Sequence, residues 1–355
     1  MLLFDAHLDL SMNAIEWNRD LTRPIDEIRA REAGMNDKLD RAKGVISFEE
    51  MRKGDMGIVI ATQIARYVAP DNPLPGWNSP EIAWSITQAQ LAWYRTMEEC
   101  GQMKQIVDKA GLDAHVELWQ NDPPADAPIG YILSLEGADS LVDLSYLETA
   151  YEYGLRALGP AHYGVGRYAP GTGVEGHLEK DGPALLAKME ELGIVLDCTH
   201  LTDDSFWQAL DLYGGPVWAS HQNCRALVPA QRQFSDDQLK ALIERDAIIG
   251  AAFDAWMMHP NWVRGVTTPE ETNLKIERIV EHIDHICQLA GNAKHCGVGS
   301  DLDGGFGREQ CPMDLETIAD LQSLTGLLSA RGYSQEDIEG IMHGNWIRRI
   351  REIWS

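Results

Sequence analysis

The sequence lacks the features that would tie the protein to a membrane or to nucleic acid. No apolar run approaches the roughly 18 to 20 residues that a membrane-spanning helix requires. Lysine and arginine total 30 against 55 aspartates and glutamates, which leaves a formal net charge of −25. A surface with so little net basic charge is poorly suited to neutralising phosphates. We therefore expect partners that are neither membranes nor nucleic acids.

Cysteine is scarce, and its spacing excludes two common kinds of scaffold. The six cysteines form no Cys-x-x-Cys pair and are scattered along the chain: Cys100, Cys198, Cys224, Cys287, Cys296 and Cys311. This spacing is unlike a disulfide framework or a structural zinc site, so we expect buried free thiols. The first seven residues also lack the basic and long apolar segments of a signal peptide. We expect a cytoplasmic protein.

Nucleotide and calcium motifs are incomplete, and no linker divides the chain. The stretch Gly-Val-Gly-Ser-Asp-Leu at 297–302 does not complete a dinucleotide-binding fingerprint, and no Gly-Lys-Ser/Thr follows a glycine-rich loop. Asp301 to Gly304 begins like a calcium loop, but the twelfth position is Pro312 instead of glutamate. No Pro/Gly/Ser-rich linker or internal repeat is present. We expect one domain over residues 1–355.

What the sequence does contain is a regular alternation of short apolar runs and helical stretches. Eight runs are predicted as strands: 2–6, 57–64, 129–135, 155–159, 194–199, 217–220, 248–253 and 296–300. Helical spacing is clear over 81–109, 141–153, 182–192, 237–245, 270–290 and 315–331. Helix start signals occur at Ser79, Ser235, Thr268 and Ser334.

This alternation predicts an α/β protein with a closed (β/α)8 barrel of the TIM type. Strands separated by helices pair in parallel through right-handed crossovers, and eight such units close into a barrel. The alternative is an open, doubly wound sheet, which more usually carries a glycine-rich phosphate turn after its first strand. Here the chain reads Asp-Ala-His-Leu-Asp at residues 5–9.

The ends of the predicted strands are rich in side chains that bind metals. In a barrel, the carboxyl ends of the strands face the active site. The residues at these ends are His7, Asp9, Glu136, His162, His200, His221, Asp254 and Asp301. Each alone could be a hydrogen-bonded structural residue or a helix cap. Together they combine imidazoles with carboxylates, the ligand mix expected for zinc and related metals. We therefore expect a metal site at this end of the barrel.

His7 and Asp9 form the most specific local pattern. Side chains alternate between the two faces of a strand, so residues two apart point the same way. The His-x-Asp spacing therefore lets both side chains bind one ion.

With these residues in place, the chain resembles the membrane (renal) dipeptidase family of zinc peptidases, a branch of the amidohydrolase-type metal barrels. The resemblance extends over nearly the whole chain, with motifs in matching order and spacing. The motifs are Asp-Ala-His-Leu-Asp at 5–9, Leu-Glu-Gly at 135–137, a strand ending at His162, Asp-Cys-Thr-His at 197–200, Ser-His at 220–221, Arg232, Gly-Ser-Asp-Leu-Asp-Gly at 299–304 and Gly-Asn-Trp-Ile-Arg at 344–348.

The resemblance implies two zinc ions per chain. His7 and Asp9 would hold one ion, His200 and His221 would hold the other, and Glu136 would bridge them.

It also implies roles for the residues that handle substrate. His162 would face the scissile carbonyl, Arg232 would bind the substrate carboxylate, and Asp301 would transfer the proton. Asp254 departs from the family, whose members commonly carry a tyrosine near this position. It is either a helix cap or a pocket residue whose unpaired carboxylate would favour dipeptides with a cationic side chain.

The expected function is therefore a zinc-dependent dipeptidase that hydrolyses dipeptides with a hydroxide bridging the two metals. The alternatives are a related binuclear amidohydrolase acting on another amide, a lactone or a phosphoester, and a catalytically silent barrel. The expected partner is a small dipeptide, and a homodimer is possible.

Overall fold

A closed ring of parallel strands forms the centre of the computed structural model, which describes residues 1–70 and 72–355. The strands of the ring are β1 (Leu3–Leu8), β2 (Met56–Gln63), β4 (Ile129–Glu136), β5 (Leu155–Gly159), β6 (Val195–Asp197), β7 (Val217–Trp218), β8 (Ile249–Ala251) and β9 (Cys296–Val298). Their order is β7-β6-β5-β4-β2-β1-β9-β8, and every pairing is parallel.

The two ends of this path meet through a bridge between Ala219, which follows β7, and Ile249 of β8. The Ala219 amide donates to the Ile248 carbonyl at 3.0 Å, and the Gly250 amide donates to the Ala219 carbonyl at 2.8 Å. These bonds close the barrel. The predicted (β/α)8 fold and all eight predicted strands are confirmed.

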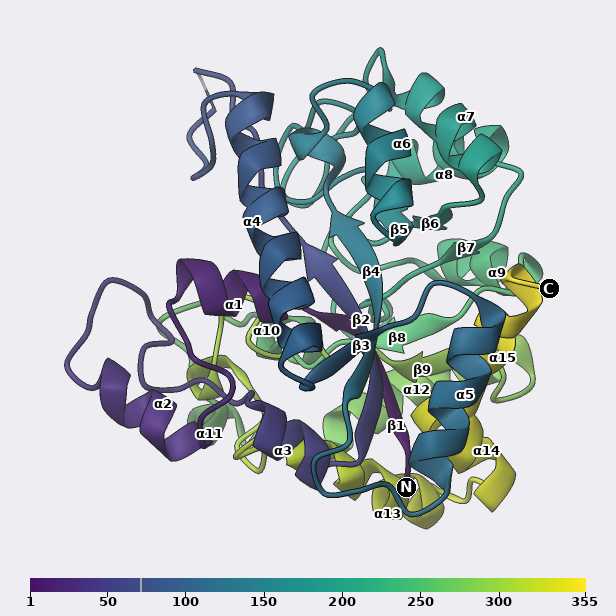
Figure 1. Ribbon diagram of the computed structural model, residues 1–355. Coiled ribbons are helices and arrows are strands. Elements are labelled where there is room, and N and C mark those ends of the chain that lie inside the picture. The colour runs from purple at the N-terminus through teal and green to yellow at the C-terminus, as the bar shows by residue number, and fades with distance from the viewer. Residues whose placement is uncertain (71) are drawn as a thin grey trace.

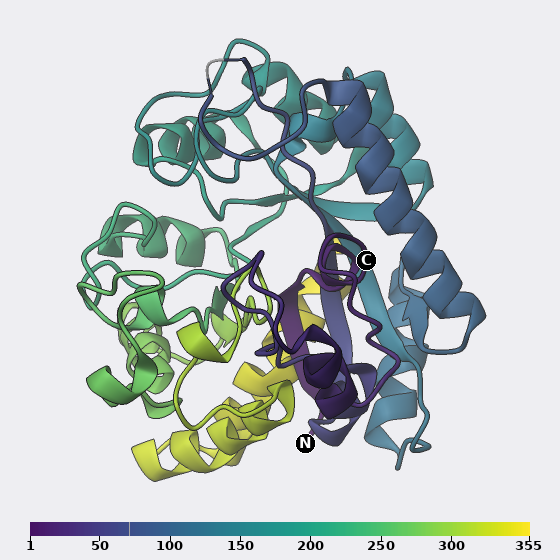
Figure 2. The ribbon, with the colours of Figure 1, turned by 90° about the vertical axis from the view of Figure 1, so that its left-hand side faces the viewer.

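Helices surround the barrel, as Figures 1 and 2 show. They are α1 (Leu10–Glu16), α2 (Ile25–Glu32), α3 (Phe48–Lys53), α4 (Pro80–Glu99), α5 (Lys109–Gln120), α6 (Ser145–Glu152), α7 (Gly182–Leu192), α8 (Asp203–Leu212), α9 (Asp236–Glu244), α10 (Ala255–Met258), α11 (Pro269–Thr272), α12 (Glu277–Ala290), α13 (Leu324–Arg331), α14 (Gln335–Glu339) and α15 (Asn345–Ile353). Short helical turns are η1 (Ala138–Ser140), η2 (Arg308–Gln310), η3 (Ile318–Ser323) and η4 (Gly340–Gly344). In the turned view, α4 lies on one side of the strands and the green segment that contains α9 to α12 lies on the other.

The predicted helix starts agree with the structure. Ser79, Ser235, Thr268 and Ser334 are N-caps whose side chains accept a backbone N–H of the first turn. The last three form complete capping boxes, which satisfy two otherwise unpaired backbone donors.

Four predicted helices are wrong in their extent. The helix predicted over 141–153 begins only at Ser145, and the one predicted over 315–331 is α-helical only from Leu324, after the turn η3. The helix predicted over 81–109 ends at Glu99, because Gly101 has a φ of +73° that a continuing helix cannot adopt. The chain then forms a further strand, β3 (Met103–Gln105), which pairs with β4 outside the barrel. The helix predicted over 270–290 is interrupted at Asn273, whose left-handed backbone caps α11 before α12 begins. Helical periodicity continued through both breaks and concealed them.

Among the described residues, no helix combines the length and the apolar character that crossing a membrane requires.

Two glycines allow the last strands to approach the residue that precedes His221. A Cβ added at Gly250 would lie 1.9 Å from the Ser220 carbonyl oxygen, and one added at Gly299 would lie 1.7 Å from it. Real side-chain atoms do not approach a backbone oxygen so closely. The position of Ser220, and with it His221, therefore depends on the absence of side chains at these two positions.

We predict that Gly299→Ala lowers the free energy of unfolding by about 2 to 3 kcal/mol, because the backbone must shift to admit the methyl group. Gly326→Ala is the matched control. This glycine lies in the exposed part of α13, where an added Cβ meets nothing within 4 Å. The control variant should be neutral or up to about 1 kcal/mol more stable. Urea unfolding measures both, and equal stabilities would contradict the close approach.

Candidate active site

The side chains predicted at the strand ends lie at one end of the barrel. The offset from each strand is regular. The third residue after the last strand residue is His162 for β5, His200 for β6, His221 for β7, Asp254 for β8 and Asp301 for β9. His7 lies within β1 and Glu136 is the last residue of β4. Parallel strands of a closed barrel therefore deliver these side chains to a common rim.

Glu136 is at the centre of this group. Its Oε1 lies 3.1 Å from Nε2 of His200, 3.4 Å from Nε2 of His221, 3.5 Å from Nε2 of His7 and 3.9 Å from Nε2 of His162. Glu136 itself is only 8% exposed. Four imidazoles thus direct the same nitrogen toward one buried carboxylate.

The opposite nitrogens of two imidazoles contact hydroxyl groups. Nδ1 of His200 lies 2.8 Å from the Thr172 Oγ1, and Nδ1 of His221 lies 2.9 Å from the Ser220 Oγ. A hydroxyl can accept the Nδ1–H, which leaves the Nε2 lone pair free. The two Nε2 atoms are 3.0 Å apart. This is the arrangement by which proteins orient metal-binding histidines.

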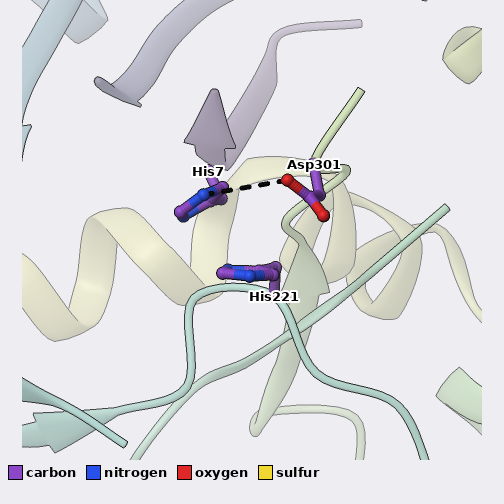
Figure 3. A group of neighbouring side chains, drawn as sticks. All are labelled: His7, His221 and Asp301. Carbon is purple, nitrogen blue, oxygen red and sulfur yellow. Dashed lines mark ion pairs between the residues drawn. The ribbon is translucent and has the colours of Figure 1, made fainter. Parts of the chain in front are cut away.

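His7 and Asp9 complete the group on the side of β1. Figure 3 shows the His7 ring beside His221 and Asp301, which come from the loops after β7 and β9. His7 Nε2 lies 3.8 Å from Asp301 Oδ1 and 3.9 Å from Asp9 Oδ1, and it has no hydrogen-bond partner among the described residues. Thr62 donates a hydrogen bond to Asp9. A buried nitrogen without a partner fits a site that binds a cation.

Burial and charge set the protonation states of this group. Burial alone would keep His7 neutral, but the carboxylates around it, Glu136 foremost, outweigh burial and raise the pKa of His7 to about 10. Burial would likewise raise the pKa of Glu136, yet the imidazoles, His7 first among them, hold it well below its usual range. Burial keeps the pKa values of His200 and His221 well below that of free histidine.

Three small sets of these groups are close enough to hold one ion: His7, Asp9 and Glu136; His7, His221 and Asp301; and Glu136, His162 and His200.

Two of these residues have unusual backbone conformations. The φ angle is +69° at His200 and +60° at Asp301. Left-handed conformations cost residues other than glycine of the order of 1 to 3 kcal/mol and are concentrated at functional sites.

Arg232 lies in the same cavity, whose volume is about 430 Å³. Its side chain is buried and donates to the His221 carbonyl at 2.8 Å and to the Gln222 side chain. It forms no ion pair with a carboxylate in the described part of the chain. Burial of this unpaired charge lowers its pKa. A buried guanidinium that opens into a cavity is well suited to bind a carboxylate of a ligand.

Asp254 lines the cavity and is also a helix cap. It is the N-cap of α10, and its Oδ1 accepts hydrogen bonds from the Gln310 side chain at 2.7 Å and from the Trp256 amide at 3.4 Å. Burial raises its pKa to about 7. The carboxylate is therefore not unpaired, which was the condition for a preference for cationic substrates. Its part in substrate binding stays a prediction.

Arg66 is a cavity-lining residue that the sequence analysis missed. It is the third residue after β2, the same offset that places His162, His200 and His221. Its Nη2 lies 2.6 Å from His162 Nδ1. Its position three residues after the strand end could have identified it in the sequence. Arginine does not bind metals, however, so Arg66 was not among the candidate metal ligands.

A barrel with such a cluster of imidazoles and carboxylates at one rim is typical of metal-dependent hydrolases. The family model described as membrane dipeptidase (peptidase family M19) matches residues 1–354. The chain belongs to this family of metallopeptidases, which confirms the resemblance drawn from its motifs. The protein is therefore a hydrolase that acts on peptide bonds with a metal cofactor.

Named relatives include fungal dipeptidases. Dipeptidase tcpJ of Claviceps purpurea is 30% identical over 232 residues, which cover 63% of this chain and 52% of that protein. An uncharacterized dipeptidase of Schizosaccharomyces pombe is 28% identical over 88% of this chain and 74% of its own. Dipeptidase aclJ of Aspergillus oryzae is 25% identical over 99% of this chain and 78% of its own.

Solved structures share the fold. The dipeptidase AC, a metallo peptidase, superposes with a TM-score of 0.80 at 22% identity and covers 100% of this chain and 99% of its own. A metallo peptidase from Rhodobacter sphaeroides, liganded with a phosphinate mimic of the dipeptide L-Ala-D-Ala, has a TM-score of 0.79 at 22% identity, with coverage of 100% and 99%. Both similarities support the (β/α)8 barrel fold of this chain.

We predict that Thr172→Val weakens metal binding about 10- to 100-fold, because His200 loses the hydroxyl that orients its ring. The side chains have similar shapes, so the change removes mainly the hydrogen bond. Thr96→Val, on the exposed face of α4, is the matched control. Competition with a chromophoric zinc chelator measures the affinities. Equal affinities for both variants and the wild type would contradict the role of Thr172.

Proposed function

We propose that the protein is a zinc-dependent dipeptidase that holds two zinc ions per chain and hydrolyses the peptide bond of dipeptides. One observation carries the proposal. Four imidazole Nε2 atoms surround the buried Glu136 carboxylate in a cavity that also contains the unpaired Arg232 guanidinium. The first feature suits a metal centre, and the second suits a substrate with a free carboxylate.

The donor set fits two ions that share Glu136. We assign His7 and Asp9 to one ion, and His200 and His221 to the other. The buried, unpartnered His7 Nε2 and the adjacent Nε2 atoms of His200 and His221 support this division. Ions bound there would polarise a carbonyl oxygen and lower the pKa of a bound water to near neutrality.

Arg232 would fix the substrate by its C-terminal carboxylate. A guanidinium offers two parallel N–H donors to a carboxylate, so it can define both the position and the orientation of the chain end. A cavity of about 430 Å³ lies in the size range of sites that bind small molecules, which suits a dipeptide. The distance from Arg232 to the metal ligands would then select substrates with the length of a dipeptide.

Asp301 and His162 would act at the scissile bond. As water attacks the carbonyl carbon, its proton passes to the Asp301 carboxylate and then to the nitrogen of the leaving amine when the C–N bond breaks. Without bound ions, burial raises the pKa of Asp301 well above its usual range. The positive charge of bound ions would lower that pKa, so that Asp301 could be ionised when it accepts the proton. His162 would donate a hydrogen bond to the oxygen on which negative charge develops.

Assays with several substrate classes test this function. We expect hydrolysis of dipeptides that chelation abolishes and added zinc restores, with about two zinc ions bound per chain. Chelation should also lower the melting temperature, since the metals bind only the folded chain. Turnover of a lactone or a phosphotriester with no turnover of dipeptides would favour the related amidohydrolase. Bound metal without any turnover would favour the silent barrel, and full activity after metal removal would refute the metal mechanism.

We predict that Arg232→Met raises KM for dipeptides about 10- to 100-fold with a much smaller change in kcat, because it removes a charged contact made equally in the ground and transition states. The control is the same dipeptide with its C-terminal carboxylate converted to an amide. The wild type should prefer the free carboxylate, and the variant should lose that preference. A defect in kcat alone would contradict the role of Arg232.

Three further expectations from the sequence stay predictions. These are the single domain over residues 1–355, the cytoplasmic compartment and the homodimer. The match of the family model to residues 1–354 supports the first. Light scattering on the purified protein tests the third.

A further inference from the structure

Arg66 and His162 form a close contact at the wall of the cavity. Nη2 of the guanidinium lies 2.6 Å from His162 Nδ1. Nη1 donates to the Pro75 carbonyl at 2.8 Å, and the Arg66 carbonyl accepts from the Trp77 amide at 2.8 Å. Backbone contacts on both sides therefore hold the guanidinium against the ring.

The chemistry of this contact determines where the histidine carries its proton. A guanidinium has five N–H donors and no acceptor, and it stays charged in proteins. His162 Nδ1 must therefore accept the bond with its lone pair. A neutral imidazole carries one proton, so that proton is on Nε2.

This assignment separates His162 from the other imidazoles around Glu136. His200 and His221 contact hydroxyls through Nδ1, and a hydroxyl can accept an Nδ1–H. Their Nε2 atoms are then free to bind metal. His162 contacts a pure donor, so its Nε2 carries the proton and cannot bind metal without forming an imidazolate. His162 is close enough to Glu136 and His200 to complete a group of three possible metal ligands. Its protonated Nε2 makes it a hydrogen-bond donor in that group instead of a ligand.

We propose that Arg66 is a positioning residue that fixes His162 as an Nε2–H donor facing the cavity. The use of this donor at the substrate carbonyl oxygen rests on the proposed dipeptidase function, but the protonation of the ring does not. Arg66 has no ion pair with a carboxylate among the described residues. Its charge therefore acts on the imidazole directly and strengthens the Nε2–H as a donor.

The first test reads the tautomer in the zinc-loaded protein. Histidine labelled with ¹⁵N gives long-range NMR spectra that distinguish a protonated nitrogen from one with a free lone pair, and His162→Gln assigns the signals. In the wild type, we expect protonated Nε2 and unprotonated Nδ1 at residue 162. Arg66→Met should lose this pattern, and Arg66→Lys should keep it because an ammonium also only donates.

The second test compares kinetics. Arg66→Met should lower kcat about 10- to 100-fold and change KM less than about threefold, since the donor acts mainly on charge that develops in the transition state. Arg66→Lys should recover part of kcat. Arg264→Met is the control for loss of positive charge, because Arg264 is exposed at the cavity mouth and bonds the Gly305 carbonyl. It should keep the tautomer pattern, and any effect on kcat should be smaller.

A protonated Nδ1 at His162 in the wild type would overturn the proposal. So would an Arg66→Met variant that keeps both the Nε2–H pattern and the wild-type kcat, or an Arg264→Met variant with the same kinetic loss as Arg66→Met. If the wild type shows the expected tautomer but does not hydrolyse dipeptides, the proposed function fails and the role of Arg66 in fixing the tautomer stands.

Discussion

The buried carboxylate of Glu136 is the constraint on which the rest of the site depends. An ionised carboxylate removed from water is costly unless positive charge or hydrogen-bond donors compensate for it. Here the compensation comes from one imidazole of strand β1 and from imidazoles of three separate strand connections, all within 3.9 Å of one oxygen. With His7 protonated, this arrangement is electrostatically tolerable without a metal. Divalent cations would replace that proton and supply the larger charge that the carboxylates can balance.

The barrel fixes the positions of the side chains that form this centre. A fixed offset of three residues after the strands brings His162, His200, His221 and Asp301 to one rim, and Arg66 follows the same rule. The left-handed backbones at His200 and Asp301 are part of this geometry. The stability lost to these conformations is offset by the rest of the fold, where the barrel strands are almost entirely buried.

The sequence predicted the barrel, and it predicted that the candidate ligands lie together at one end of it, because both follow from local patterns. Period-two alternation placed His7 with Asp9, and the strand ends identified Glu136 and the other imidazoles. The sequence could not show contacts between distant segments. Arg66 and His162 are 96 positions apart, and only the structure shows that their side chains are in contact. The strand β3 was hidden for a different reason, since helical periodicity continued across Gly101.

The central claim is that the Glu136 carboxylate organises the metal centre, and the zinc content of Glu136→Gln tests it most directly. Glutamine keeps the shape of the side chain and removes its charge. After dialysis against a zinc-buffered solution, we predict about two zinc ions in the wild type and in the exposed control Glu117→Gln, but less than one in Glu136→Gln. Two ions retained in Glu136→Gln, with the fold intact, would contradict the account.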